Sequence, residues 1–176
     1  MNLWNDLETG PKPPEIIHVI VEIPKGSKLK YKFKPLKKEW YLTLDRILYS
    51  PLFYMGNYGI IPQTRWIGGQ PLDCMVLMDE PVPPEAVITA RPIAILEMLD
   101  NDRKDDKVIA VAVGDPATEH FKDLPDLNNT LKNQISEFFR SYKQLGGDKV
   151  EVLGWKGAES ARKAIKTAQR VFNERS

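Results

Sequence analysis

The sequence predicts an α+β fold in which strands come first along the chain and two helices follow. Before Pro125, apolar residues recur with period two or form short runs rich in Val and Ile, which favours strands. After Pro125 they recur at three- and four-residue spacing, which favours amphipathic helices. Because the two patterns are segregated rather than alternating, we expect the helices to pack on one small barrel or sheet, all antiparallel or mixed.

The clearest strand lies at residues 28–34, where Lys alternates with Leu29, Tyr31 and Phe33. Its lysines are Lys28, Lys30, Lys32 and Lys34. The other expected strands are 18–24, 40–44, 73–78, 87–99, 107–113 and 150–155. Segments rich in Gly, Pro, Asn or Asp are expected to be a packed loop at 51–63, a turn at 68–71 and a hairpin turn at 100–106.

Two helices are predicted, at residues 129–145 and 158–172. The first carries an apolar stripe and is followed by Gly146, a common helix stop. The second aligns Ala161, Ile165, Ala168 and Phe172 on one face.

The composition indicates one globular domain over residues 1–176, introduced by an arm at 1–14 that is rich in Gly and Pro. Its apolar runs are too short to span a bilayer, and the N-terminus lacks a signal-peptide pattern. We therefore expect a cytoplasmic protein without a membrane partner. Cys74, the single cysteine, excludes an intramolecular disulfide, and two histidines leave little for a His-based metal site.

Two local charge patterns each have a plain structural explanation. The acids between Asp100 and Asp106 would suit a hard cation such as Mg²⁺, but alone they are typical of a solvated hairpin turn. The segment does not match the calcium-loop template, because Asp105 stands where the template has glycine and Val111 where it has its closing glutamate. The lysine strand would attract a polyanion, or would simply protect a sheet edge from aggregation. Nucleic acid is not an expected partner, because Tyr31 and Phe33 alternate with the lysines and should face away from them.

Taken together and in order, the motifs resemble family I inorganic pyrophosphatases over residues 10–172. They are Val21-Glu22-Ile23-Pro24, Lys30-Tyr31, Asp45-Arg46, Phe53-Tyr54-x-x-Asn57-Tyr58-Gly59, Pro71-x-Asp73, Arg91-Pro92-Ile93, Asp100 to Lys107, Phe138-Phe139-x-x-Tyr142-Lys143 and Gly154-Trp155. The resemblance implies an OB-like five-stranded β-barrel with two flanking C-terminal helices, usually assembled as a homohexamer.

The resemblance also implies a reaction and a site. Members of this family hydrolyse pyrophosphate to two phosphates with Mg²⁺ ions and metal-activated water. Carried over by position, the metal ligands are Asp73, Asp100 and Asp105, and the groups that bind pyrophosphate or phosphate are Lys30, Arg46, Tyr58, Lys107, Tyr142 and Lys143. Tyr58, Asp73 and Lys107 are the expected catalytic groups, supported by Glu22, Tyr54 and Asn57.

Four positions depart from the family pattern. Where the family carries Asp-x-Asp-Pro-x-Asp, residues 68–73 read Gly-Gly-Gln-Pro-Leu-Asp, so Gly68 and Gln70 replace two acids. Lys32 stands where the family has Glu, and Asn101 stands where the family commonly has Glu. An amide has no useful basicity at neutral pH, so Gln70 cannot serve as a general base. The pocket should favour anions and hold fewer cations.

Two hypotheses follow from these departures. In the first, the chain is an inorganic diphosphatase with impaired metal binding, slowed by the loss of its base. In the second, it is a non-catalytic relative that binds pyrophosphate or another phosphate anion.

Overall fold

The computed structural model describes residues 2–36 and 39–174. The strands are β1 (Ile17–Ile23), β2 (Leu29–Leu36), β3 (Glu39–Ile47), β4 (Asn57–Ile60), β5 (Asp73–Leu77), β6 (Val87–Asp100), β7 (Arg103–Lys104), β8 (Lys107–Ala112) and β9 (Val150–Gly157). The α-helices are α1 (Leu3–Asp6), α2 (Asn129–Ser141) and α3 (Ala158–Glu174), and the 3-10 turns are η1 (Ile67–Gly69), η2 (Leu124–Asp126) and η3 (Gln144–Gly146).

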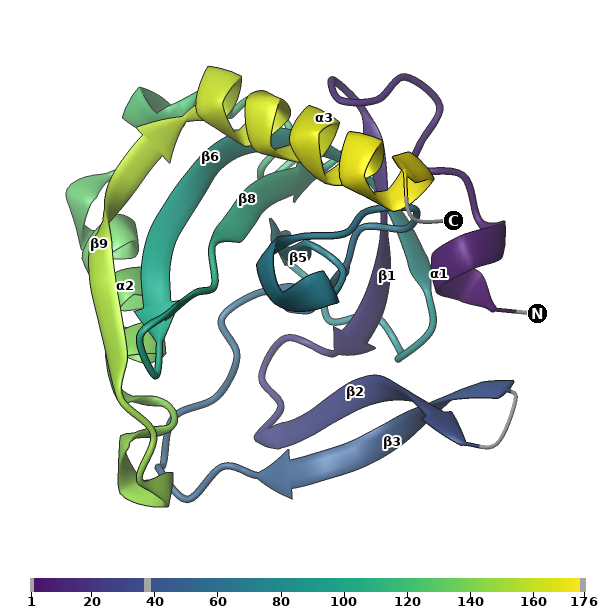
Figure 1. Cartoon of the computed structure of the whole chain (residues 1–176). Helices are drawn as coiled ribbons and strands as arrows, with labels where there is room; N and C mark the ends of the chain where they lie inside the picture. Colours follow the sequence, from purple (N-terminus) through teal and green to yellow (C-terminus); the bar gives the residue numbers. More distant parts are fainter. Residues whose placement is uncertain (1, 37–38, 175–176) are drawn as a thin grey trace.

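Five of the described strands close into a ring. Around it, β1 pairs with β4, β4 with β5, β5 with β8, β8 with β6, and β6 returns to β1. The β5–β8 pair is parallel and the other pairs in the ring are antiparallel. The long strand β6 curves and also carries β9 along one side (Figure 1). The structure thus confirms an α+β fold built on a small mixed barrel.

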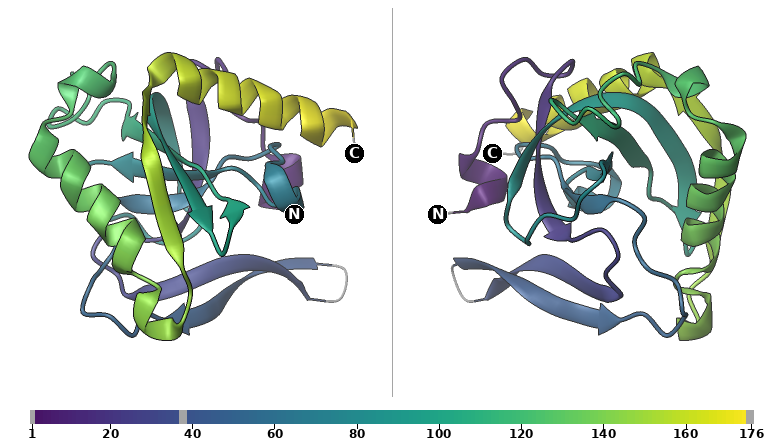
Figure 2. Two further views of the ribbon diagram at one scale, coloured as in Figure 1. Left: turned by 60° about the vertical axis from the view of Figure 1, so that its left-hand side comes forward. Right: turned by 180° about the vertical axis from the view of Figure 1, so that it is seen from behind.

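The lysine strand is β2, and it pairs with β3 in a hairpin that lies beside the barrel (Figures 1 and 2). A register shift between Lys30 and Tyr31 interrupts the ladder. Such a bulge re-aims the side chains that follow it. Lys30, Tyr31, Lys32 and Phe33 all border one cavity, although strict alternation predicted that the aromatic side chains would face away from the lysines.

The two predicted helices cover different buried clusters. Along β8, Ile109 and Val111 belong to the cluster that includes α2, while Val108 and Ala110 belong to the cluster that includes α3. Since both faces of this strand are buried, its sequence is a continuous apolar run. The predicted positions of both helices are confirmed. However, α2 ends at Ser141 and a separate 3-10 turn occupies residues 144–146.

Two segments differ from the sequence prediction. The loop expected at 51–63 contains β4, whose Gly59 faces β1 so closely that an added Cβ would lie 1.9 Å from the Ile20 carbonyl oxygen. The N-terminal arm contains α1 and is anchored by Trp4, whose indole Nε1 donates a hydrogen bond to the Thr64 carbonyl (2.8 Å). None of the helices in the described part of the chain has the length and apolar character needed to cross a membrane.

Candidate functional site

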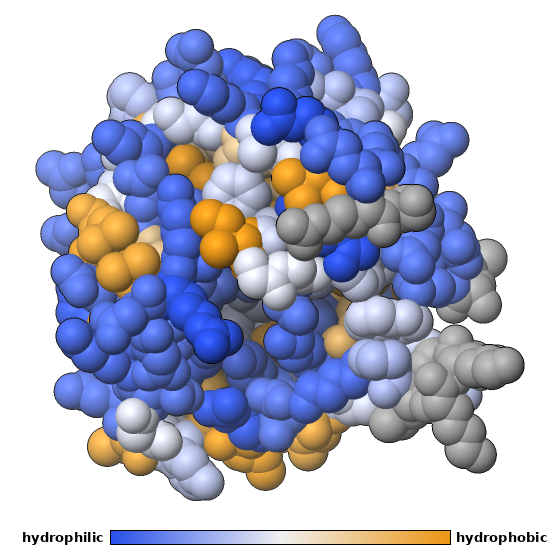
Figure 3. All heavy atoms as spheres, in the orientation of Figure 1, coloured by the Kyte–Doolittle hydropathy of each residue, from blue (hydrophilic) through white to orange (hydrophobic). Residues whose placement is uncertain are grey.

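A cavity of about 360 Å³ opens between one end of the barrel and the β2–β3 hairpin. Figure 3 shows a hollow on this face with hydrophilic residues along its lower rim. Acidic and basic side chains from several elements line it, among them Asp73, Asp105 and Lys107 where β5 and β8 begin, Asp100 at the end of β6, and Lys30 on β2. Residues that are far apart in the sequence therefore share one pocket.

The centre of the pocket is an ion cluster around Lys107. The parallel register pairs Asp73 with Lys107, so both side chains start from neighbouring strands. The Lys107 ammonium donates to Asp73 Oδ2 at 2.6 Å and to Asp105 Oδ1 at 2.7 Å. The Tyr58 hydroxyl donates to the same Asp73 oxygen at 2.7 Å. Lys107 is only 1% exposed, whereas the side chains of Asp73 and Asp105 are 24% and 30% exposed, so the ammonium is buried beneath two carboxylates that solvent still reaches.

Burial and pairing oppose each other in this cluster. Burial lowers the pKa of Lys107, but Asp73 and Asp105 outweigh it and hold the pKa above its ordinary value. Burial likewise raises the pKa of Asp73. The charge of Lys107 and the hydrogen bonds from Lys107 and the Tyr58 hydroxyl lower it by more, so the pKa of Asp73 lies below its ordinary value. For Asp105 burial wins, and the pKa lies above the ordinary value. Lys107 is therefore a fixed positive charge between two carboxylates.

Asp100 also lines the pocket, paired with a different lysine. The Lys143 ammonium, which follows α2, donates a hydrogen bond to Asp100 Oδ2. Asp100 Oδ1 is buried and has no hydrogen-bond partner among the described residues. Such an orphaned carboxylate oxygen calls for a cation or a water molecule. Within residues 2–36 and 39–174, however, no three acids, histidines or cysteines are placed together as a ready-made metal site.

The hairpin contributes Lys30 and Lys32 to the pocket. Burial, together with the nearby cations Lys143 and Arg46, lowers the pKa of Lys30 to about 8. Asp45, whose Oδ2 lies 4.0 Å from the Lys30 ammonium, offsets part of this effect. Lys30 is thus a cation held among other cations, an arrangement that an anion would relieve.

Glu22 on β1 also lines the pocket and is buried. Its Oε1 accepts a hydrogen bond from the Phe33 amide at 2.9 Å. Burial raises its pKa to about 8, and the negative charge of Asp73 adds to this effect. At neutral pH the Glu22 carboxyl group is therefore mostly uncharged.

We expect Glu22→Gln to stabilise the fold at alkaline pH. A carboxyl with a pKa near 4.5 in the unfolded chain and about 8 in the folded one destabilises the folded state increasingly as pH rises between these values. The amide of Gln can keep the hydrogen bond from Phe33 without ionising. Thermal unfolding should show a melting temperature several degrees above wild type at pH 9 and almost unchanged at pH 4.5. Equal shifts at both pH values would contradict the prediction.

Two residues that the sequence analysis expected around the pocket do not line it. Arg46 donates from Nη1 to Asp148 Oδ2 at 2.9 Å, and Asn101 donates from Nδ2 to Asp148 Oδ1 at 3.1 Å. Both are thus held at the rim by one acid of the loop before β9. Arg46 still acts on Lys30 through its charge. Of the four positions that the sequence analysis expected to depart from the family pattern, Lys32, Gly68 and Gln70 line the pocket.

Tyr142 and Lys143 both line the pocket, but Tyr54 and Asn57 do not. Tyr54 is buried in an aromatic cluster with Tyr58, Phe138 and Tyr142. Asn57 ties two loops to the barrel: its Oδ1 accepts from the amides of Lys25 and Val82, and its Nδ2 donates to the Glu80 carbonyl. These two residues support the site through the scaffold.

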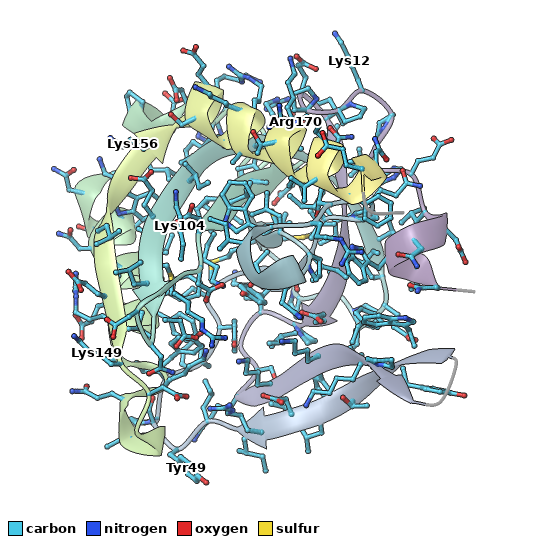
Figure 4. All side chains as sticks on the ribbon, in the orientation of Figure 1. Lys12, Tyr49, Lys104, Lys149, Lys156 and Arg170 are labelled. Carbon is cyan, nitrogen blue, oxygen red and sulfur yellow. The ribbon has the colours of Figure 1, made fainter. Side chains whose placement is uncertain are left out.

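The sequence analysis overlooked one group of pocket residues. Trp4, Trp40 and Trp66 line it, and Arg103 and Lys104 form part of its rim. The labelled Lys104 can be located in Figure 4. No local pattern singles out these residues, because the three tryptophans come from the arm, the hairpin and the loop before η1.

Comparison with known proteins agrees with this architecture. Residues 19–173 match the family described as inorganic pyrophosphatase. The chain is 42% identical to the inorganic pyrophosphatase of Haloferax volcanii over 99% of this chain and 98% of the relative. It is 43% identical to soluble inorganic pyrophosphatase 3 of Arabidopsis thaliana over 97% of this chain and 78% of the relative.

Solved structures show the same fold. The inorganic pyrophosphatase of Thermus thermophilus superposes with a TM-score of 0.93 at 35% identity, covering 98% of this chain and 99% of that one. The match therefore extends over the barrel, the hairpin and both long helices. This chain belongs to the family I inorganic pyrophosphatases.

Proposed function

We propose that the pocket binds inorganic pyrophosphate and that the chain hydrolyses it to two phosphates in the presence of Mg²⁺. The observation that carries the proposal is the convergence of Lys30, Lys107 and Lys143 on one cavity that four aspartates also line. These lysines come from β2, β8 and the segment after α2. A small polyanion is the ligand that relieves their mutual repulsion.

In this proposal each lysine has a distinct task. Lys107 is fixed by Asp73 and Asp105, so it offers a preorganised charge to a phosphate oxygen. Lys143 is held toward the pocket by Asp100, and Lys30 gains an anionic partner. Tyr58 keeps Asp73 oriented through its hydroxyl. Charge that develops on the leaving phosphate then meets cations already in place.

The acidic residues fit a divalent cation in part. Carboxylate oxygens are the ligands that Mg²⁺ prefers, and Asp100, which lines the pocket, has a buried Oδ1 without a hydrogen-bond partner among the described residues. Asp73 and Asp105 are engaged with Lys107. We infer that Asp100, Asp73 and Asp105 would hold Mg²⁺, with fewer ions than in relatives that carry more acids. Magnesium, when bound, supplies positive charge to phosphate oxygens and makes the attacking water more acidic.

The proposed rate is lower than that of a relative with the full acid set. Gln70 and Gly68 line the pocket where a base and a metal ligand would otherwise lie. Losing a general base typically costs about 10²–10⁴-fold in rate. The test is phosphate release from pyrophosphate with Mg²⁺, followed colorimetrically beside the Haloferax volcanii relative. Turnover by the wild-type chain that is lost in Lys107→Met supports the proposal. A complete lack of turnover by the wild-type chain contradicts it.

The substituted acids also favour a second candidate function, binding without catalysis. Lys32 adds a cation to a pocket in which Gln70 cannot take a proton. In this case calorimetry would detect pyrophosphate binding in excess chelator, while phosphate release would stay at background. Turnover at or above about 1 s⁻¹, within the usual range for enzymes, would exclude this reading.

Anion binding to the pocket should weaken above pH 8. Lys30 has a pKa near 8 and carries its charge only below that value. Sulfate is a suitable probe because its charge is constant from pH 6 to pH 10. We expect its affinity to fall about tenfold between pH 7 and pH 9.5. Lys30→Arg keeps its charge over this range and should flatten the dependence of sulfate affinity on pH. The double variant Lys30→Arg with Glu22→Gln also removes the other group with a pKa near 8. An unchanged profile in both variants would refute this assignment.

We further propose self-association, as the family resemblance implies. Large apolar side chains are exposed at Leu44 and Ile47 on β3, at Tyr49 and Phe53 after it, and at Leu145 in η3. Figure 3 shows hydrophobic residues along the lower edge of the molecule. Figure 4 shows Tyr49 pointing away from the body of the molecule. Contiguous exposed apolar surface is typical of protein–protein contacts. Light scattering should give a homohexamer, and Tyr49→Lys with Phe53→Lys should reduce its mass.

A further inference from the structure

The β2–β3 hairpin forms a wall of the pocket without belonging to the barrel sheet. Among the described strands, β2 and β3 pair only with each other, so no sheet ladder holds them to the barrel. Two side-chain contacts attach the hairpin elsewhere: Trp40 packs edge-on against Trp4, and the Phe33 amide donates to Glu22. Neither contact involves the end of the hairpin that carries Lys30.

Like charges oppose each other across the pocket. Lys30 and Lys32 line it from β2, whereas Lys107 begins β8 and Lys143 follows α2. Burial is the largest cause of the lowered pKa of Lys30, and the charges of Lys143 and Lys107 lower that pKa further. In the absence of an anion, repulsion between these lysines therefore favours moving the hairpin away from the barrel.

One ion pair opposes this movement. Arg46 on β3 donates from Nη1 to Oδ2 of Asp148, in the loop before β9, at 2.9 Å. Within residues 2–36 and 39–174, it is the only ion pair that joins the hairpin to the rest of the chain. Arg46 is the register partner of Lys30 in the ladder. The pair thus holds the backbone at Lys30.

Asp148 is itself fixed to the barrel side of the pocket. Its Oδ1 accepts from Asn101 Nδ2 at 3.1 Å, and the next residue, Lys149, exchanges two hydrogen bonds with Asn101. Asn101 directly follows Asp100, the last residue of β6. The hydrogen bonds from Asn101 and Arg46 hold the pKa of Asp148 below its ordinary value, so Asp148 is charged at neutral pH. It therefore ties the hairpin to the end of β6.

We infer that Asp148 is a positioning residue that keeps the hairpin closed over the pocket and so places Lys30 for an anion. The inference rests on the anion site of the proposed function, to which it adds a residue that does not line the pocket. A wall that is already closed lowers the cost of binding. Charge alone predicts the opposite effect, because removing an acid near an anion site strengthens anion binding.

Asp148→Ala separates these two effects. By calorimetry at pH 7 in excess chelator, sulfate should bind about fivefold more weakly than to wild type. With pyrophosphate and Mg²⁺, KM should rise about fivefold while kcat changes less than about twofold, because the bound anion itself draws the lysines together. The Phe33 amide, which bonds across to Glu22, should exchange faster with deuterium by NMR. Saturating sulfate should remove this difference.

Two further variants complete the test. Glu137→Ala removes a carboxylate that accepts from an arginine, Arg140, at the same distance of 2.9 Å but outside this pocket. It should leave the sulfate affinity and the exchange of the Phe33 amide unchanged. Asp148→Glu keeps a carboxylate for Arg46 and should restore most of the affinity that Asp148→Ala loses.

Each other outcome decides against a specific claim. If Asp148→Ala binds sulfate as tightly as wild type or more tightly, Asp148 does not position the hairpin and the inference is overturned. An equal loss of affinity in Glu137→Ala, or a fall in kcat with KM unchanged, overturns it as well. If wild type binds sulfate but releases no phosphate from pyrophosphate, the proposed hydrolysis fails and sulfate affinity alone decides the role of Asp148. If wild type binds no sulfate, the anion site and the inference both fail.

Discussion

Replacing Lys32 with Glu, Gly68 with Asp and Gln70 with Asp should raise pyrophosphate hydrolysis by about 10²–10⁴-fold. All three residues line the pocket, so the variant makes it four charge units more negative, two from Lys32 and one from each other site. At about 6 Å and an effective dielectric near 20, two unit charges interact by roughly 3 kcal/mol, so Mg²⁺ affinity should rise with the rate. Phosphate release and Mg²⁺ titration measure the two effects.

The local backbone permits these changes. Gly68 has a positive φ of 84°, which Asp tolerates better than most residues, and an added Cβ would meet no atom within 4 Å. Gln70 has an extended backbone that any side chain can adopt. Gln70→Asp alone should help little, because a base needs the ion that positions its water.

Asn101→Asp is the matched control. It adds one negative charge close to Asp100, but its side chain is directed to Asp148 outside the pocket. We expect it to change the rate less than threefold. A rise in rate with this control equal to that of the triple variant would show that general charge, not the pocket positions, governs activity. A triple variant without higher Mg²⁺ affinity would refute the role assigned to the missing acids.

Lys107→Met should lower the free energy of unfolding by about 3–5 kcal/mol near pH 8. It leaves Asp73 and Asp105 together without their shared cation, which is 1% exposed in the folded chain. The loss should shrink as pH falls, because protonated carboxyls no longer repel each other. Urea unfolding at several pH values measures this, and Mg²⁺ should restore more stability to this variant than to wild type.

Lys104→Met provides the comparison. Lys104 contacts Asp106 at 3.3 Å, but its side chain is 41% exposed, so the pair should contribute at most about 1 kcal/mol. If Lys107→Met were no more destabilising than Lys104→Met, the buried cluster would not be the structural centre described above. Absence of a Mg²⁺ effect in Lys107→Met would argue that Asp73 and Asp105 do not bind the ion.

The local pattern of apolar and polar residues was sufficient to predict much of the fold. The period-two segment at 28–34 and the helical stripes after Pro125 correspond to β2, α2 and α3. Side-chain periodicity reports which face of an element is buried, and this is a local property. It could not predict β4, because residues 57–60 form a strand through backbone bonds to β1 and β5 rather than through alternation.

The ordered motifs by themselves determined the family, the strand-then-helix order and the identity of the main pocket lysines and aspartates. Only the tertiary structure decided which side chains share the pocket. Arg46 and Asn101 donate hydrogen bonds to Asp148, which lies 102 and 47 residues away in sequence. Trp4 lines the pocket although it belongs to the segment that was predicted to be an N-terminal arm. Such contacts depend on the closure of the barrel and on the docking of the hairpin, and no periodicity within one segment encodes them.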